Sequence, residues 1–164
     1  MAITLNTARW GTLNIDEDDG FAEIVMLTVN GKQRNVWLNI FEDVLPATPA
    51  AKIIALLDSV PTCEEQIQNM LVREAGENAF IDDFLEYVQE YDEETLQTLN
   101  ITTPTRLICA KSLILRGVGI WLAAPAPGTL SMTLDYGLPE EFSDQLLVFD
   151  FDENSTLRDI SWES

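Results

Sequence analysis

The sequence contains no histidine, and this absence excludes several common kinds of active site. Without an imidazole the chain cannot form a Ser-His-Asp triad or a Cys-His pair, and it cannot bind a metal through histidine. Its two cysteines alone do not supply the ligand set of a structural zinc site. The GxGxxG and GxxxxGK(S/T) patterns are absent as well, so the common nucleotide-binding loops are missing. We therefore expect no cofactor, no metal site and no catalytic residues.

Basic residues are also scarce. Lys and Arg together number 9 against 28 Asp and Glu, which gives a formal net charge of −19. The phosphate backbone of a nucleic acid and an anionic membrane surface both repel such a chain, so we expect to find neither as a partner. A basic protein is the class of partner that this electrostatic field attracts.

Cysteine is limited to Cys63 and Cys109, too few for the disulfide framework of a small secreted domain. We expect both to be reduced, mostly buried thiols. The N-terminal segment lacks a basic stretch followed by an apolar one, so it does not read as a signal peptide. No apolar run approaches the roughly 20 residues of a membrane span. These features predict a cytoplasmic protein.

The chain does have enough apolar residues for a core of its own. It has 164 residues, of which 46% are hydrophobic, and this suits a single domain over residues 1–164. Strand patterns come first, helix patterns follow, and strand patterns then return. This order predicts an α+β fold: N-terminal and C-terminal strands form a mainly antiparallel β-sheet, and a central group of helices, about residues 49–99, packs on it.

The first fifty residues read as strands, at residues 11–15, 21–29 and 34–41. An Asp-rich turn that ends at Gly20 separates the first two strands. Asn30-Gly31 between the second and third is the strongest hairpin signal in the chain. In the third strand, alternation with Trp37, Asn39 and Phe41 predicts a core-facing set of Val36, Leu38 and Ile40.

The middle of the chain reads as helices. Thr48 before Pro49 predicts an N-cap followed by Pro at the first helical position. Thr62 lies three residues before Glu65, the spacing of a capping box, and Gly76 suits the end of that second helix. A third helix follows, and its core-facing residues at helical spacing are Ile81, Phe84, Leu85 and Val88.

The last sixty residues return to strands. Residues 106–123 are ambiguous, because a helix could start them although the part from Ile114 onward favours extended chain. A loop rich in Pro and Gly follows, and Leu130, Met132 and Leu134 then share one face of a strand. Two final strands are predicted around a turn at residues 152–155.

Two Asp-rich stretches imitate a calcium-binding loop. One starts at Asp16 and the other at Asp150. Both lack the Gly at the sixth position and the Glu at the twelfth that an EF-hand loop requires. We therefore interpret both as turns built from Asp and Asn.

Negative charge is concentrated in the helical region. Residues 61–100 have a net charge of −10, more than half of the total, and the segment from Ala79 to Leu96 has seven acids with no Lys or Arg. Asp82, Glu86 and Glu90 follow one another at i+4 spacing, opposite the apolar face. Like charges at this spacing destabilise a helix by about 0.2–0.5 kcal/mol per pair, and no base in the segment offsets the repulsion.

Two interpretations of this helix remain open. It is either a solvated face that keeps an acidic protein soluble, or a docking surface for a basic protein. Tyr87 and Tyr91 favour the second, since aromatic side chains beside charge are typical of interfaces, although both could instead widen the buried face. The predicted partner-binding residues are Asp82, Asp83, Glu86, Tyr87, Glu90, Tyr91 and Glu94.

A pattern of short motifs runs through about the last fifty residues. It consists of Leu134-Asp135-Tyr136, Ser143-Asp144, the apolar run 146–149, the turn 151–155 and a final strand that ends in Glu163-Ser164. This pattern resembles an uncharacterised bacterial domain family with immunity-protein-like members. The chain differs from the family at Ser155, where the family has Gly, which puts the type of the hairpin turn in doubt.

The resemblance implies an α+β fold, no established catalytic residues, and a role as an immunity protein, a small cytoplasmic antidote that binds one toxin. Together with the charge, it predicts an inhibitor that neutralises a cognate, basic bacterial toxin domain. An acidic interaction module for another basic protein is the alternative. A small carboxylate-dependent enzyme is the third reading, and a deep pocket with convergent carboxylates of raised pKa would favour it. The oligomeric state is left open.

Overall fold

The computed structural model describes residues 2–16, 21–29, 32–41, 43–44, 48–73, 75–123 and 129–164. Its strands lie side by side in the order of the chain. They are β1 (Ala2–Thr7), β2 (Gly11–Asp16), β3 (Phe21–Val29), β4 (Lys32–Ile40), β5 (Ile114–Leu122), β6 (Leu130–Gly137), β7 (Leu146–Asp152) and β8 (Leu157–Glu163).

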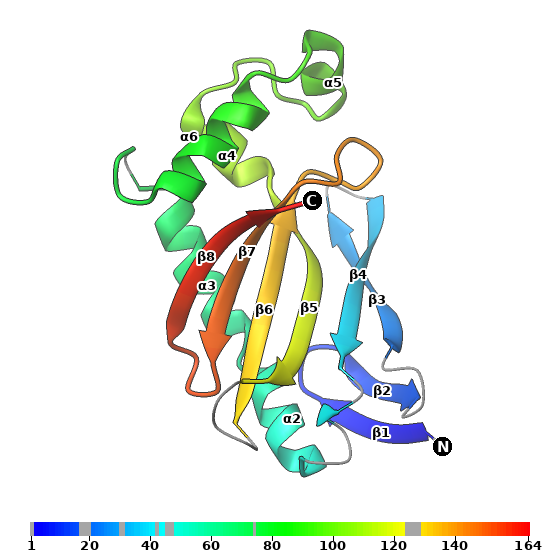
Figure 1. Ribbon diagram of the computed structural model, residues 1–164. Coiled ribbons are helices and arrows are strands. Elements are labelled where there is room, and N and C mark those ends of the chain that lie inside the picture. Colours follow the sequence, from blue (N-terminus) through cyan, green and yellow to red (C-terminus); the bar gives the residue numbers. More distant parts are fainter. Residues whose placement is uncertain are drawn as a thin grey trace.

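Neighbouring strands are antiparallel, with the exception of the parallel pair β4 and β5. This confirms a mainly antiparallel sheet formed by N-terminal and C-terminal strands. β2 meets β3 at a single paired position, Ile15 with Ala22, so β1 and β2 lie at an angle to the other strands near α2 (Figure 1). A parallel pair needs a long crossover, and the helices between β4 and β5 form it.

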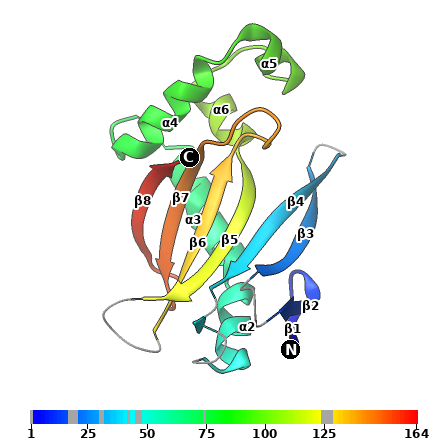
Figure 2. The same ribbon diagram turned by 45° about the vertical axis from the view of Figure 1, so that its right-hand side comes forward.

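The helices follow one another between β4 and β5. They are α2 (Ala50–Asp58), α3 (Val60–Leu71), α4 (Ala79–Gln89), α5 (Glu93–Thr98) and α6 (Arg106–Ser112). Figures 1 and 2 show the long helix α3 behind the sheet, and α4, α5 and α6 gathered at its upper end. No described helix covers the other face of β5 to β8. The helical group reaches Ser112 rather than 99, because α6 starts the ambiguous segment before β5.

The core lies between the sheet and the helices. Every residue expected to face it is buried: Val36, Leu38 and Ile40 of β4, Ile81, Phe84, Leu85 and Val88 of α4, and Leu130, Met132 and Leu134 of β6. Cys63 and Cys109 are free and buried, as predicted. Because α4 presents its apolar residues to this core, its position over β7 and β8 is fixed by side-chain packing.

The predicted starts of the first two helices were wrong, by one and by three residues. Pro49 rather than Thr48 is the N-cap of α2, since its ψ of 140° is extended, and Thr48 is buried without a capping contact. α3 begins at Val60 directly after Ser59, so Thr62 lies inside the first turn and forms no capping box. Pro61 fits this earlier start because the first turn of a helix leaves its N–H groups unpaired. Gly76 lies five residues beyond the end of α3 at Leu71, in the connection to α4.

The final hairpin has the predicted turn. Asp152 Oδ1 accepts the backbone N–H groups of Asn154 at 2.8 Å and of Thr156 at 3.0 Å. Ser155 has a φ of 63°, in the left-handed region that favours glycine. Ser155 therefore takes a backbone conformation that glycine adopts more readily. The turns predicted at residues 16–20 and at Asn30-Gly31 fall outside the described residues, although β3 and β4 pair as a hairpin up to Val29 and Lys32.

Replacing Phe84 with alanine should destabilise the fold by about 3–5 kcal/mol, because it opens a cavity in the core. Phe84 is fully buried, and its ring lies 5.1 Å from that of Trp162 on β8. Phe80 on the same helix is 47% exposed, so Phe80→Ala is a matched control that should change stability by less than about 1 kcal/mol. Urea denaturation would measure both. Equal losses would show that α4 does not dock through Phe84.

Candidate functional site

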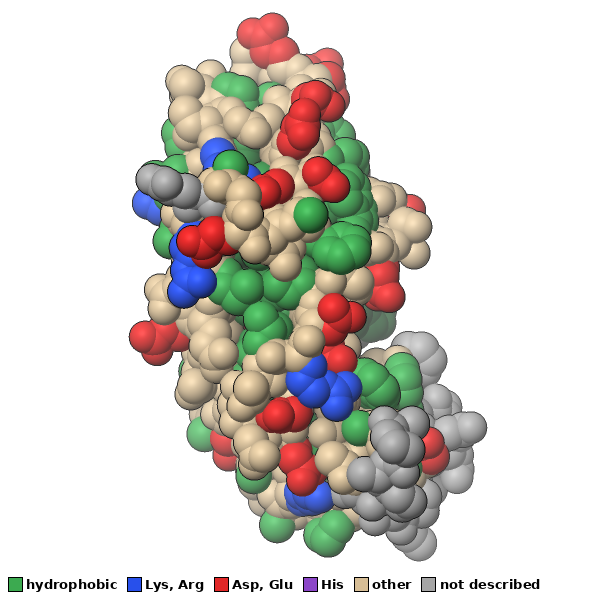
Figure 3. Space-filling model, turned by 60° about the vertical axis from the view of Figure 1, so that its left-hand side comes forward, with side chains coloured by type: hydrophobic (Ala, Val, Ile, Leu, Met, Phe, Trp, Pro, Cys, Tyr) green, Lys and Arg blue, Asp and Glu red, His purple; other side chains and the backbone are tan. Residues whose placement is uncertain are grey.

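The predicted binding residues divide into an exposed group and a packed group. Asp83, Glu86, Glu90 and Glu94 are exposed, and we call these four side chains the acidic ridge. Figure 3 shows acidic side chains at the upper end of the molecule, where α4 and α5 lie in Figure 1. Among the described residues, no hydrogen bond or ion pair involves the carboxylates of the ridge. These charges are therefore free to meet a partner.

Tyr87 and Tyr91 belong to the packed group. Their hydroxyl groups lie 2.9 Å apart, Tyr87 also contacts Ser143 Oγ at 2.9 Å, and Tyr91 donates to the carbonyl of Phe142 at 2.8 Å. The ring of Tyr87 lies 5.2 Å from that of Trp162. Burial raises the pKa of Tyr87. Tyr87 widens the buried face of α4, and Tyr91, just after the helix, joins it in contacting the loop before β7. This is the alternative that the sequence left open.

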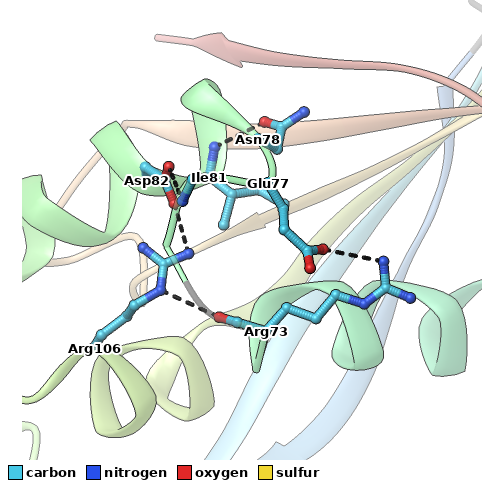
Figure 4. Close-up of polar contacts among 7 residues, drawn as sticks. Arg73, Glu77, Asn78, Ile81, Asp82 and Arg106 are labelled. Carbon is cyan, nitrogen blue, oxygen red and sulfur yellow. Dashed lines mark hydrogen bonds and ion pairs between the residues drawn. The ribbon is translucent and has the colours of Figure 1, made fainter.

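Asp82 is held in a network between helices. Its Oδ1 lies 2.7 Å from Nη2 of Arg106 on α6, and its Oδ2 accepts the backbone N–H of Gly76 at 2.8 Å. Arg106 also donates to the carbonyl of Arg73 just after α3, at 3.3 Å (Figure 4). No base within the acidic segment pairs with Asp82, as expected, but one from another helix does. The compensating arginine comes from α6, twenty-four residues along the chain from Asp82.

The acids after Glu90 lie at the start of a separate short helix. α4 ends at Gln89, and α5 begins at Glu93 with Asp92 as its N-cap. The Asp92 carboxylate accepts the backbone N–H of Thr95 at 2.9 Å, and this hydrogen bond lowers the pKa of Asp92. Glu93 and Glu94 lie in the first turn of α5, where the helix dipole favours negative charge. One continuous helix would have placed them at the unfavourable end.

A cleft on the open face of the sheet is a second candidate surface, and the sequence analysis did not predict it. Its volume is about 660 Å³. One wall is aromatic and comes from β4 and β5, and the opposite wall is acidic and comes from β6, β7 and β8. The aromatic residues are Trp37, Phe41 and Trp121, and the acidic residues are Asp135, Asp150, Asp159 and Glu163.

Two glycines of β5 form the floor between these walls. The strand register places Gly117 between Trp37 of β4 and Asp135 of β6. A Cβ atom at Gly117 would lie 2.9 Å from Oδ2 of Asp135, and one at Gly119 would lie 2.7 Å from Oγ1 of Thr133. These distances are shorter than van der Waals contact, so a side chain at either position would displace the wall of the cleft. The glycines thus leave room for the carboxylate of Asp135 and the hydroxyl of Thr133 to lie over β5.

The cleft is negative in its electrostatics. Burial, and secondarily the charge of Glu163, raises the pKa of Asp135 from 3.8 to about 6, while Arg116 acts in the opposite direction. Among the described residues, Asp135 has no hydrogen-bond or ion-pair partner. Arg158 Nη2 pairs with Oδ2 of Asp150 at 3.1 Å. No Lys or Arg is among the described residues that line the cleft, so the charges of Asp135 and Glu163 are left uncompensated within it.

Other chemistry has little support in the described part of the chain. It contains no group of three or more potential ligands from Cys, Asp or Glu that could hold a metal ion. Burial raises the pKa of both cysteine thiols, which keeps them in the unreactive protonated form. None of the described helices has the length and apolar character that crossing a bilayer requires.

No protein-family model, curated protein or solved structure matches this chain. The resemblance of the C-terminal motifs to a bacterial family with immunity-protein-like members therefore stays a prediction.

The raised pKa of Asp135 predicts a pH-dependent difference in stability. The neutral carboxyl is favoured in the folded protein, so its stabilisation is present below the ordinary pKa of 3.8 and is lost as pH rises through about 6. Asp135→Asn mimics the neutral form and should be more stable than the natural chain at neutral pH by up to about 3 kcal/mol.

Urea denaturation between about pH 4 and 7.5 would measure this difference, which should vanish at the acidic end. Asp159→Asn is the matched control, because Asp159 lines the same cleft but is exposed. A constant difference across the pH range for Asp135→Asn would contradict the assignment.

The network around Asp82 makes a separate prediction. Asp82→Ala removes the ion pair to Arg106 and the acceptor for Gly76, and should reduce stability by about 1–2 kcal/mol. Glu86→Ala, one turn further along α4, removes an exposed charge and should change stability by less than about 0.5 kcal/mol. Thermal or urea unfolding would compare the two variants. Equal losses of stability would show that the contacts of Asp82 with Arg106 and Gly76 do not stabilise the fold.

Proposed function

We propose that this protein is an immunity-type inhibitor that binds and neutralises a basic bacterial toxin domain. The observation that carries the proposal is the acidic ridge. Its four carboxylates are exposed on α4 and α5, and among the described residues none of them is engaged by a hydrogen bond or an ion pair. The net charge of −19 adds a long-range field of the same sign.

Electrostatics of this kind favour fast and selective association with a basic surface. An acidic protein attracts a basic partner before contact, and charge pairs that lose water in the complex slow its dissociation. A toxin that cleaves a nucleic acid needs a basic surface to hold phosphates, so an acidic antidote can occupy the same surface. Blocking such a surface requires no catalytic residue in the inhibitor, in keeping with the absence of histidine and of nucleotide-binding motifs.

Reversing charge on the ridge should weaken the complex. Glu86→Lys with Glu90→Lys should make the free energy of binding less favourable by about 2 kcal/mol or more, because two attractive contacts become repulsive. Both side chains are exposed, so the fold should be retained. The partner would be captured from the native cells at low salt, released by a salt gradient, identified by mass spectrometry and then titrated by calorimetry.

A control variant with the same change in net charge is available on α3. Glu65→Lys, Gln68→Lys and Asn69→Lys replace three exposed side chains at a distance from the ridge along the chain. This triple variant should bind the partner nearly as well as the natural chain, with only the small loss of long-range electrostatic attraction that its less negative net charge causes. If the ridge variant binds with unchanged affinity, the ridge is not part of the interface. If the control loses as much affinity as the ridge variant, the ridge acts only through the net charge of the protein.

A small carboxylate-dependent enzyme is the second candidate, and one observation favours it. Asp135 has a pKa raised to about 6 and lies with Glu163 in an open cleft, which is the environment of many catalytic acids. An enzyme of this kind would turn over a neutral or cationic small molecule, and Asp135→Asn would abolish turnover while preserving the fold. Inhibition of a toxin would then survive the same substitution, which separates the two candidates.

A further inference from the structure

The cleft on the open face of the sheet has a composition that selects one kind of ligand. Across β4, β5 and β6 the register sets Trp37, Gly117 and Asp135 in one transverse row. The strands β4 and β6 are two strand spacings apart, about 9–10 Å, and because Gly117 has no side chain, the carboxylate of Asp135 can lean over it into the space between them. A group that enters this space meets an indole on one side and a carboxylate on the other.

The charges exclude an anion and favour a cation. Asp135 and Glu163 have no compensating base among the described residues of the cleft, while Asp150 is paired with Arg158. A cation beside the indole gains from the electrons of the ring, and beside the carboxylate it gains a charged hydrogen bond. The guanidinium group of arginine is flat, stacks on aromatic rings and donates through several N–H groups, so it suits both walls better than the compact ammonium of lysine.

We propose that the cleft between Trp37 and Asp135 binds an arginine side chain of the basic partner. This rests on the proposed function, since it names the side chain by which a basic protein would be anchored. Trp162 of β8 packs against Tyr87 of α4, and the next residue, Glu163, lines the cleft on the opposite face of the sheet.

The ionised side chain of Asp135 also lowers the stability of the free protein. Its ionised form is disfavoured by burial and by Glu163 in the free protein, and an asparagine would remove that disadvantage. Residues that reduce stability in an open cleft are typical of binding sites, where the ligand supplies the missing partner. A bound guanidinium would neutralise both carboxylates at once.

The test uses a small probe, so that it does not depend on the identity of the partner. Nα-acetylarginine amide would be titrated into the full chain and followed by NMR of the tryptophan indole N–H groups. The chain has 4 tryptophans, which gives an internal control. Trp37 and Trp121 should shift with a dissociation constant in the millimolar range, as is usual for a single side chain, while Trp10 and Trp162 should stay in place.

The neutral analogue Nα-acetylcitrulline amide has the same shape without the charge. It should bind at least about tenfold more weakly than the arginine probe. Asp135→Asn should weaken the arginine probe at least about fivefold, whereas Asp144→Asn, at an exposed acid outside the cleft, should leave it unchanged. The ridge variant Glu86→Lys with Glu90→Lys should also bind the probe normally.

Acidification adds a second readout. Between about pH 7.5 and 5 the affinity should fall, because protonation removes the charge of Asp135 that the guanidinium requires. The charged groups that act on Asp135 are Glu163 and Arg116, and Asp150 and Asp159 line the same cleft, so the fall should be lost in Asp135→Asn.

The outcomes separate this inference from the proposed function. Saturable shifts at Trp37 and Trp121 that need both the positive charge and Asp135 would support an arginine site. No saturable shift, or equal binding of the citrulline analogue, would overturn it. If the ridge variant fails to bind the partner and the natural chain does not bind the probe, the inhibitor function is supported and the arginine site is wrong. If the natural chain binds the probe and the ridge variant still binds the partner, the cleft is a cation site and the ridge is not the interface.

Discussion

The parallel pairing of β4 with β5 is the contact on which the rest of the structure depends. Two parallel neighbours cannot be joined by a tight turn, so the chain between Ile40 and Ile114 must cross from one end of the sheet to the other. In the described residues it does so through α2 to α6, of which α3 lies behind the sheet and α4 packs over β7 and β8. The opposite face of β5 to β8 is thereby left without a helical cover among the described residues (Figure 2).

The same pairing builds the cleft. It brings Trp37 of the N-terminal half beside Gly117 of the C-terminal half, and the antiparallel partner β6 then adds Asp135 in the same row. None of these residues is close to the others in sequence. The helical crossover meanwhile carries the acidic ridge on the outer side of α4 and α5, because the inner side of α4 is occupied by apolar residues. One topological constraint thus produces both candidate surfaces.

The two surfaces differ in what their charges do to the fold. Part of the charge on α4 and α5 has partners within the protein, since Asp82 is paired with Arg106 and Asp92 caps α5, and the carboxylates of the acidic ridge face solvent. Asp135 is not accommodated, since burial and Glu163 raise its pKa towards neutrality. A charge that is tolerated is consistent with solubility as well as with binding. A charge that opposes the fold needs another reason to be present, and a cationic ligand supplies one.

The sequence by itself determined the elements and their faces. Alternation placed Val36, Leu38 and Ile40 towards the core, and helical spacing did the same for Ile81, Phe84, Leu85 and Val88, because these periods follow from local backbone geometry. Helix starts were less well determined, since the position of Pro61 and the burial of Thr48 outweighed the capping preferences of single residues. The concentration of acids was visible, and its exposed members Asp83, Glu86, Glu90 and Glu94 follow from the same helical period.

Only the tertiary structure decided which polar and aromatic residues meet. Tyr87 and Tyr91 turn inward because their hydroxyl groups form hydrogen bonds with residues more than fifty positions away in sequence. Tyr87 is hydrogen-bonded to the Ser143 hydroxyl, and Tyr91 donates to the Phe142 carbonyl. The cleft was present in the sequence only as separate signs: an aromatic second face on β4, two glycines on β5 and an Asp on β6. Their chemistry depends on strand order and register, which arise from contacts between distant segments and have no local signal in the chain.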